Sequence, residues 1–262
     1  MRCLSLTLLF TLLCNLSWAD DIVLQANESP PYWSKFQANG GLGSELVQAI
    51  SAAAGLQTRI DFVPLTRMIE DRDNNDLGNP EFYMDQQEFA AIIPIAISEA
   101  SLFYYRPHFP QPPHIDSFDD LKQYRLGVLK GTLINRNAFE QWGLHFETSY
   151  TQASLFKKLK AGRLDLVFEI DLVGQQMIAQ AFSHETNNFV RQPLANSISP
   201  IAIMLDAEYP NAQIIADQYR QGLATIIADG RYQAIVQKYY PNRQLPIDWF
   251  NALRRFQQLY AF

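Results

Sequence analysis

Two acidic residues, Glu169 and Asp171, follow an apolar segment at 164–168 that predicts a buried strand. Ligands of open α/β sheets bind outside the carboxyl ends of the strands, so an acid at this place is a candidate site residue. A solvated carboxylate in a surface loop is the alternative for either residue. The sequence offers both acids as candidates and leaves the choice between them open.

A candidate anion site follows another predicted strand, at 125–129. Gly131 and Thr132 come directly after that strand and open a predicted helix. The first N–H groups of a helix lie at the positive end of its dipole, so they attract a carboxylate, and the Thr132 hydroxyl adds a donor. An ordinary helix N-cap is the alternative.

Aromatic residues follow the first predicted strand, Ile22–Ala26. Tyr32 and Trp33 stand in the Pro-rich loop at the carboxyl end of that strand, where a ring can stack on a ligand. A loop ring that packs on its own half of the protein is the alternative. Tyr32 is therefore a candidate wall of a ligand site.

Other patterns that carry chemistry are weak or absent. His108 and His114 flank a run of prolines without the acidic geometry that would support a metal site. Gly41 and Gly43 lack the later glycine of a dinucleotide-binding loop. The sequence contains no Gly-x-Ser-x-Gly, His-Glu-x-x-His or phosphate-loop motif. We expect no metal, no cofactor and no enzymatic activity.

The N-terminal residues predict an export signal that is not part of the fold. Arg2 precedes an apolar run, Leu4–Leu13, and Ser17 and Ala19 are small residues at the positions that a signal peptidase recognises. A membrane anchor is the alternative, but the run is shorter than the ~20 residues of a spanning helix. We expect cleavage after Ala19 and a periplasmic product.

Composition limits the class of the exported protein. The 262 residues are 48% hydrophobic and 18% charged, which is typical of a globular protein. A formal net charge of −6 argues against nucleic acid or an anionic membrane as the main partner. Both cysteines, Cys3 and Cys14, lie in the predicted signal, so the mature chain has no thiol for a disulfide or a metal.

The elements that would position the candidate residues form two strand–helix–strand units. The first predicts a parallel strand pair with a helix between them that is capped by Ser44 and ended by Gly55. The second follows a proline cluster at 107–113, which we interpret as the first crossing between two halves. Predicted strands are 22–26, 58–63, 125–129, 145–148, 164–168 and 201–205, with apolar runs at 89–97 and 101–105; predicted helices include a short one from Ser154 to Gly162 and 211–228, 231–240 and 248–260.

This order of motifs resembles the family 3 periplasmic solute-binding proteins, the amino-acid-type receptors of ABC importers. The resemblance spans essentially the whole mature chain, and it rests on motifs that are weak alone but stand in the family's order and spacing. They are Ser29-Pro30-Pro31-Tyr32, Phe118-Asp119-Asp120-Leu121-Lys122, Arg125-Leu126-Gly127-Val128 with Gly131-Thr132, Leu159-Lys160-Ala161-Gly162-Arg163-Leu164-Asp165, and Ile227-Ala228-Asp229-Gly230 running into Tyr239-Tyr240-Pro241.

The resemblance implies an α/β fold of the two-lobe, periplasmic-binding-protein-like (type II) kind. Each lobe would be a mostly parallel sheet flanked by helices, with the ligand cleft between the lobes. Mapped on this chain, the signal peptide is 1–19, lobe 1 is 20–107 plus 198–262, and lobe 2 is 108–197.

The resemblance also gives the candidate acids and the anion site their expected roles. In the family an acid near the end of the predicted strand at 164–168 receives the ligand's α-ammonium, and the position of Gly131 and Thr132 holds its carboxylate. The usual spacing of the acid falls on Ile170, between Glu169 and Asp171. Either acid could serve, or the amine site could be absent.

A carboxylate-binding arginine is missing from its usual place in the resembling family. That place lies shortly before 89–97, where this chain has Met84–Glu88 without arginine. Arg67, in Pro64-Leu65-Thr66-Arg67, is the best substitute, because it is similar to a Pro-x-x-Arg of a divergent branch and can fork a carboxylate. The alternative for Arg67 is a helix-start arginine that pairs with Glu70 or Asp71.

The resemblance therefore predicts a monomeric solute-binding protein outside the cytoplasm. It would capture a small polar solute, an amino acid or a related organic acid, by hinge closure and present it to the membrane permease of an ABC importer. A periplasmic ligand-sensing subunit for a membrane signalling protein is the alternative, and an enzyme is less favoured. The sequence does not identify the solute.

Overall fold

The computed structural model describes residues 21–70, 73–82, 87–130, 132, 140–141, 143–240, 245 and 248–261. The predicted signal peptide lies outside these ranges, and so does most of the helix that the sequence predicts after Thr132. Within the described ranges, no helix has both the length and the apolar character needed to cross a membrane.

One eight-stranded sheet, in the order β2-β1-β3-β8-β4-β7-β5-β6, runs through the described part of the chain. Its outer wings are parallel, as β1 pairs with β2 and β3, and β5 pairs with β6 and β7. The central pairs that involve β4 and β8 are antiparallel. The strands are β1 Ile22–Ala26, β2 Thr58–Phe62, β3 Asp76–Gly78, β4 Phe89–Tyr105, β5 Leu126–Leu129, β6 Phe146–Ser149, β7 Leu166–Ile170 and β8 Phe189–Asp206.

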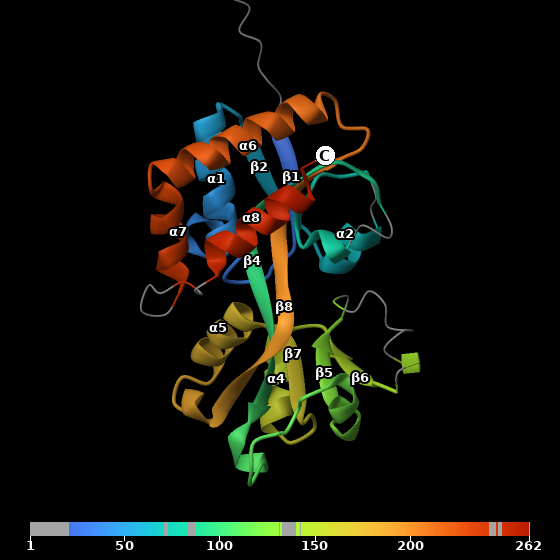
Figure 1. The fold of residues 1–262 in the computed structure, drawn as a ribbon. Coiled ribbons are helices and arrows are strands. Elements are labelled where there is room, and N and C mark those ends of the chain that lie inside the picture. Colours follow the sequence, from blue (N-terminus) through green and yellow to red (C-terminus); the bar gives the residue numbers. More distant parts are fainter. Residues whose placement is uncertain are drawn as a thin grey trace, which may run out of the picture.

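Helices cover the two ends of this sheet separately (Figure 1). Helices α1, α2, α6, α7 and α8 surround the half that holds β1 and β2, while α4 and α5 lie with β5, β6 and β7. We call these the first and second halves. The helices are α1 Leu42–Ala54, α2 Leu65–Glu70, α4 Gln152–Lys160, α5 Asp171–Ala181, α6 Ala212–Ala228, α7 Arg231–Tyr239 and α8 Trp249–Leu259, with 3-10 turns at Ala38–Gly40, Pro80–Phe82, Arg106–His108, Phe118–Gln123 and Thr186–Asn188.

Strands β4 and β8 run through both halves (Figure 1). They pair from Phe89↔Asp206 at one end to Tyr105↔Phe189 at the other. The two apolar runs that the sequence suggests at 89–97 and 101–105 are therefore one strand. The proline cluster comes after this strand has reached the second half, so the interpretation of the cluster as the first crossing is wrong. The exact lobe boundaries stay a prediction.

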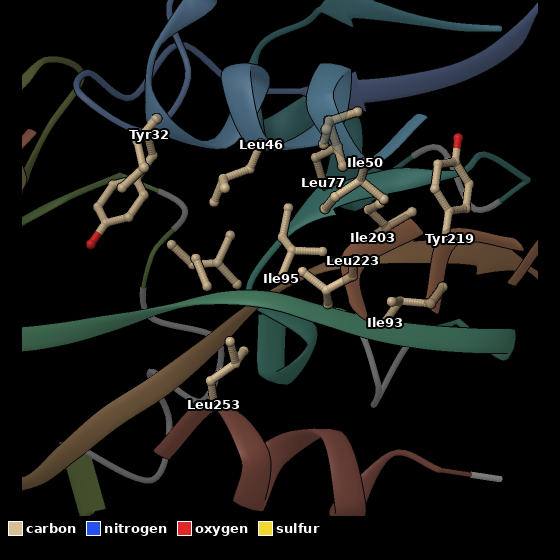
Figure 2. Close-up of a cluster of buried hydrophobic side chains, with 14 of the residues drawn as sticks. Tyr32, Leu46, Ile50, Leu77, Ile93, Ile95, Ile203, Tyr219, Leu223 and Leu253 are labelled. Atoms are coloured by element: carbon tan, nitrogen blue, oxygen red, sulfur yellow. The ribbon is translucent and has the colours of Figure 1, made fainter. Parts of the chain in front are cut away.

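Each half is built around apolar clusters of buried side chains. The first contains β1, α1 and the beginning of β4, and Figure 2 shows Leu46 and Ile50 of α1 facing Ile95 of β4. The second half has its own clusters, one beneath α4 and α5 around Phe103 and one around Leu102. The beginning of β4 packs mainly with α1 and the C-terminal helices, and its end packs with α4 and α5, while Leu172 and Val173 at the start of α5 also belong to the first cluster.

The starts of two helices also differ from the sequence predictions. Helix α1 begins at Leu42, after Gly41 at φ +94°, and the predicted cap Ser44 lies inside it. Helix α4 is capped by Thr151, whose hydroxyl accepts from the N–H of the predicted cap Ser154 at 3.2 Å. The observed caps, Gly41 and Thr151, each lie three residues before the cap that the sequence predicts.

Close packing of α1 on α6 gives a first prediction. A Cβ added to Gly222 would lie 2.4 Å from the carbonyl oxygen of Ile50 and 3.1 Å from the Cβ of Ala54. Alanine is a better helix former by about 1 kcal/mol, but this overlap dominates, so Gly222→Ala should lower the free energy of unfolding by about 1–3 kcal/mol in urea titrations. Gln221→Ala, at the exposed neighbouring position, is the control and should change it by less than about 0.5 kcal/mol. A more stable Gly222→Ala protein would contradict this packing.

Candidate functional site

A cavity of about 90 Å³ lies between the two halves and is lined by residues of both. Ser98 of β4 stands where the strand passes from one half to the other. The remaining lining comes from the first half (Asn27, Ser29, Tyr32, Trp33, Leu65, Gly78, Asn79 and Ile201) and from the second half (Leu129, Thr132, Gln152, Phe168, Glu169 and Ile170). We call this cavity the inner chamber.

A larger cavity of about 350 Å³ adjoins the inner chamber. Four residues line both of them, namely Asn27, Leu65, Leu129 and Gln152. Its other lining residues are Glu28, Lys35, Phe62, Val63, Pro64, Thr66, Lys130 and Tyr150. We call it the outer chamber. The two chambers form one cleft between the halves, in keeping with the cleft that the sequence predicts.

Glu169 brings a buried carboxyl group to the inner chamber. The residue is 7% exposed, and its Oε1 accepts from the N–H of Ile170 at 2.8 Å. Its Oε2 is buried without a hydrogen-bond partner among the described residues. Burial raises the pKa of this carboxyl to about 7. The group is thus poised to ionise near neutral pH and lacks the partner that an ionised carboxylate needs.

The end of β7 explains this burial. The sequence places Glu169 just after a strand at 164–168, but β7 extends to Ile170, so Glu169 is a strand residue opposite Ser101 of β4. The hydroxyl of Ser101 is also buried and without a partner among the described residues. Two buried polar atoms, Oε2 of Glu169 and Oγ of Ser101, therefore lie on paired residues of neighbouring strands without a hydrogen-bond partner among the described residues.

Asp171 has partners that Glu169 lacks. It is the first residue of α5, a helix that the sequence analysis missed. One of its oxygens accepts from Nε2 of Gln175 at 2.7 Å, and the other from Nη1 of Arg191 at 2.5 Å. It is not among the residues that line the inner or outer chamber. The structure therefore separates the two acids that the sequence left equivalent.

Tyr32 and Trp33 form an aromatic wall of the inner chamber. Tyr32 is almost fully buried, and its hydroxyl donates to the carbonyl of Ile97 at 3.2 Å. Burial raises the pKa of this hydroxyl well above its usual value, with the Tyr240 side chain adding to the effect. Figure 2 places the ring at the margin of the first core. The wall is thus held by packing on its own half while it faces the chamber.

Thr132 lies in the lining, but its donors already have an acceptor. Its hydroxyl donates to the carbonyl of Leu129 at 2.7 Å, and its N–H donates to the same oxygen at 3.2 Å. Gly131, the other half of the predicted anion site, lies outside the described residues. The anion site at these two residues stays a prediction.

Arg67 is placed beside the cleft and not in its lining. It is exposed on the short helix α2, whose first residues Leu65 and Thr66 line the outer chamber. Arg67 itself lines neither chamber. Its expected contact with a ligand carboxylate stays a prediction.

Several lining residues were missed by the sequence analysis. Lys130 directly follows a predicted strand and Gln152 begins α4 just after β6, so the rule that points to carboxyl ends of strands could have found both. Ser98 lies inside a strand, where nothing in the local sequence marks it. Within the described residues, no group of three or more His, Cys, Asp and Glu side chains is arranged to hold a metal.

Known proteins match this chain in structure and not in sequence. No family model matches it, and a search of curated proteins finds no match. A histidine kinase sensor domain with similarity to periplasmic binding proteins is 20% identical, with 84% of this chain covering 96% of that one at a TM-score of 0.67. An ancestral arginine-binding protein bound to arginine is 18% identical, and 84% of this chain covers 98% of that one at a TM-score of 0.66.

A third solved structure is the arginine-, lysine-, histidine-binding protein ArtJ from Geobacillus stearothermophilus. It is 15% identical, and 89% of this chain covers 99% of that one at a TM-score of 0.65. These likenesses establish that this chain has the fold of periplasmic binding proteins. The fold class and the resemblance that the sequence predicts are confirmed at this level.

The raised pKa of Glu169 predicts how stability changes with pH. Between about pH 4.5 and 7 the folded protein holds a proton that the unfolded chain has released, so this group lowers stability as pH rises through that interval. The loss amounts to roughly 3 kcal/mol above pH 7. Glu169→Gln should remove it, because a neutral amide does not ionise.

Urea unfolding at pH 5 and pH 8 measures this effect. The variant and the native protein should be similar in stability at pH 5, and the variant should be the more stable at pH 8. Glu208→Gln, which changes an exposed carboxyl outside the cleft, should follow the native protein at both values. An equal pH dependence for the Glu169 variant and the native protein would show that Glu169 titrates normally.

Proposed function

We propose that this chain is an extracytoplasmic solute-binding protein whose cleft captures a small polar solute that carries an amine. The observation that carries the proposal is the buried Oε2 of Glu169, which has no hydrogen-bond partner among the described residues and belongs to a residue that lines a chamber between the halves. An ammonium group of the solute would supply that partner. The known ligands in the names of matching structures include arginine, lysine and histidine, which fits a solute of this class.

Electrostatics favour Glu169 over Asp171 as the acceptor. An ionised carboxylate out of water is costly unless it is paired, and Asp171 is already paired with Arg191. A solute cation that reaches Glu169 would hold it ionised and would gain a charge-assisted hydrogen bond in a place sheltered from solvent. The aromatic wall of Tyr32 and Trp33 would contact the aliphatic part of the solute.

The middle of β4 and β8 is the proposed hinge. Glu99 pairs with Ile198, but Ser101 already pairs with Pro193, so the register shifts across residues 194–197 of β8. The ladder is therefore irregular where the two halves meet, and small backbone rotations there would move the halves as units. A solute held by residues of both halves would stabilise the closed form alone.

The partner of this protein is proposed from its expected location. The predicted signal at 1–19 would place the mature chain outside the cytoplasm, beside a membrane permease that takes over the solute. An input subunit for a membrane signalling protein is the second candidate, which the match to a histidine kinase sensor domain favours. Uptake of labelled solute by a deletion strain distinguishes the two, because loss of uptake indicates an importer and normal uptake with a lost transcriptional response indicates a sensor.

Binding of a panel of amine-bearing solutes tests the proposal. Calorimetry should find a saturable solute, and Glu169→Gln should weaken it about ten- to a hundredfold through the loss of one charge-assisted hydrogen bond. Affinity for the native protein should fall about tenfold per pH unit below pH 7, because the ammonium must displace the proton on Glu169. The variant should lose that pH dependence, and Glu208→Gln should keep the native affinity.

Two results would count against this function. The amine site fails if Glu169→Gln binds the solute as tightly as the native protein does at pH 7. The assignment to binding without turnover fails if NMR of the solute after long incubation with the protein shows a new compound.

A further inference from the structure

The outer chamber carries charge of the opposite sign to that of Glu169. Its lining includes two lysines, Lys35 from the first half and Lys130 from the second. The one acid in the same lining is Glu28, whose carboxylate accepts from the backbone N–H of Lys35 at 3.2 Å. The cleft is thus acidic at its inner end and mainly basic at its outer end.

Lys130 is positioned beside an exposed aromatic ring. Its Nζ lies 3.0 Å from the hydroxyl of Tyr150 and 4.5 Å from the centre of that ring. Tyr150 is 81% exposed, which is unusual for a large aromatic side chain that serves only packing. The ammonium of Lys130 lowers the pKa of the Tyr150 hydroxyl. The pair offers a cation, a hydroxyl and a ring face to the outer chamber.

Among the described residues, the ammonium groups of Lys35 and Lys130 form no ion pair, although Glu28 lines the same chamber. The Nζ of Lys35 lies 5.0 Å from the centre of the exposed ring of Phe36. Four other lysines form ion pairs with an acidic side chain: Lys122 with Asp119, Lys158 with Glu147, Lys160 with Glu185 and Lys238 with Glu45. The two lysines that line the cleft are left available for an anionic group of a solute.

We propose that the outer chamber binds the anionic end of an elongated solute whose amine is held by Glu169. The class of solute is an unbranched amino acid with its ammonium and carboxylate at opposite ends. This inference rests on the amine site proposed above and adds the second point of recognition. The inner chamber would bind the ammonium of the solute, and the outer chamber would bind its carboxylate through lysines from both halves.

The distribution of charged side chains along the cleft disfavours a compact α-amino acid. An α-amino acid carries its ammonium and carboxylate on one carbon, so an ammonium on Glu169 would leave the carboxylate in or beside the inner chamber. No lysine or arginine among the described residues lines that chamber, and both donors of Thr132 are directed to Leu129. A carboxylate there would be out of water without a cation, which is costly. The outer chamber removes this cost for a longer solute.

Two isomers test this separation of charge. The compounds 5-aminopentanoate and L-norvaline have the same atoms and the same net charge, and they differ in the carbon that bears the amine. Pentylamine has the chain and the amine without the carboxylate. Calorimetry on the full mature chain should give 5-aminopentanoate an affinity at least about tenfold higher than that of either other compound.

Substitutions of the two lysines test whether their ammonium groups bind the carboxylate of the solute. Lys130→Gln should weaken 5-aminopentanoate about tenfold and leave pentylamine within about twofold, and Lys35→Gln should act in the same direction. Lys157→Gln, which changes an exposed lysine on α4 outside the chamber linings, is the control and should change neither affinity. Far-ultraviolet circular dichroism and melting temperatures check that each variant is folded.

The outcomes separate this inference from the function on which it rests. The outer chamber does not bind the carboxylate if L-norvaline binds as tightly as 5-aminopentanoate, or if both lysine variants still prefer 5-aminopentanoate to pentylamine as strongly as the native protein does. Either result would contradict this inference and leave the amine site unaffected. If the three compounds fail to bind, the elongated class is wrong for this cleft. If the native protein binds no amine-bearing solute of the panel, the proposed amine site at Glu169 is also wrong.

Discussion

A carboxyl group held out of water between the two halves is the constraint on which the rest of this structure depends. Burial raises the pKa of Glu169 to about 7, and one of its oxygens has no partner among the described residues. At neutral pH the folded protein therefore bears either an unpaired charge or a proton that the unfolded chain would release, and both reduce stability. Under the proposed function, a cation that enters the cleft would relieve this cost, and solute binding and closure would gain free energy from the same interaction.

The scaffold keeps that group in place by making each half rigid around its own core. In the first half, the hydroxyl of Tyr232 donates to the carbonyl of Ile95 at 2.9 Å, and Trp249 donates to Tyr232 at 3.1 Å, so the C-terminal helices grip the beginning of β4. In the second half, Phe103 packs edge to face on Phe156 of α4. Between these two anchored stretches, the β4–β8 ladder is irregular. Two packed ends and an irregular middle support the proposed hinge.

Sequence periodicity predicts the elements well because each strand–helix–strand unit is stabilised by local patterns. Sequence periodicity does not predict features that depend on contacts between residues far apart in the chain. The continuity of β4 depends on its ladder with β8, about a hundred residues away, and the pairing of Asp171 depends on Arg191 from β8. The choice between Glu169 and Asp171 could therefore not be made from their spacing. Lys130 directly follows β5, so the rule of strand carboxyl ends does identify it as a candidate.

Carboxyl resonances of Glu169 give the most direct test of this account. In protein labelled with carbon-13 at glutamate carboxyls, with Glu169→Gln used for assignment, the free protein should show Glu169 titrating near pH 7. Saturation with an amine-bearing solute should move that titration well below pH 7, because an adjacent ammonium favours the ionised form. A titration near pH 4.5 in the free protein, or one that the bound solute leaves in place, would contradict the claim that Glu169 awaits a cation.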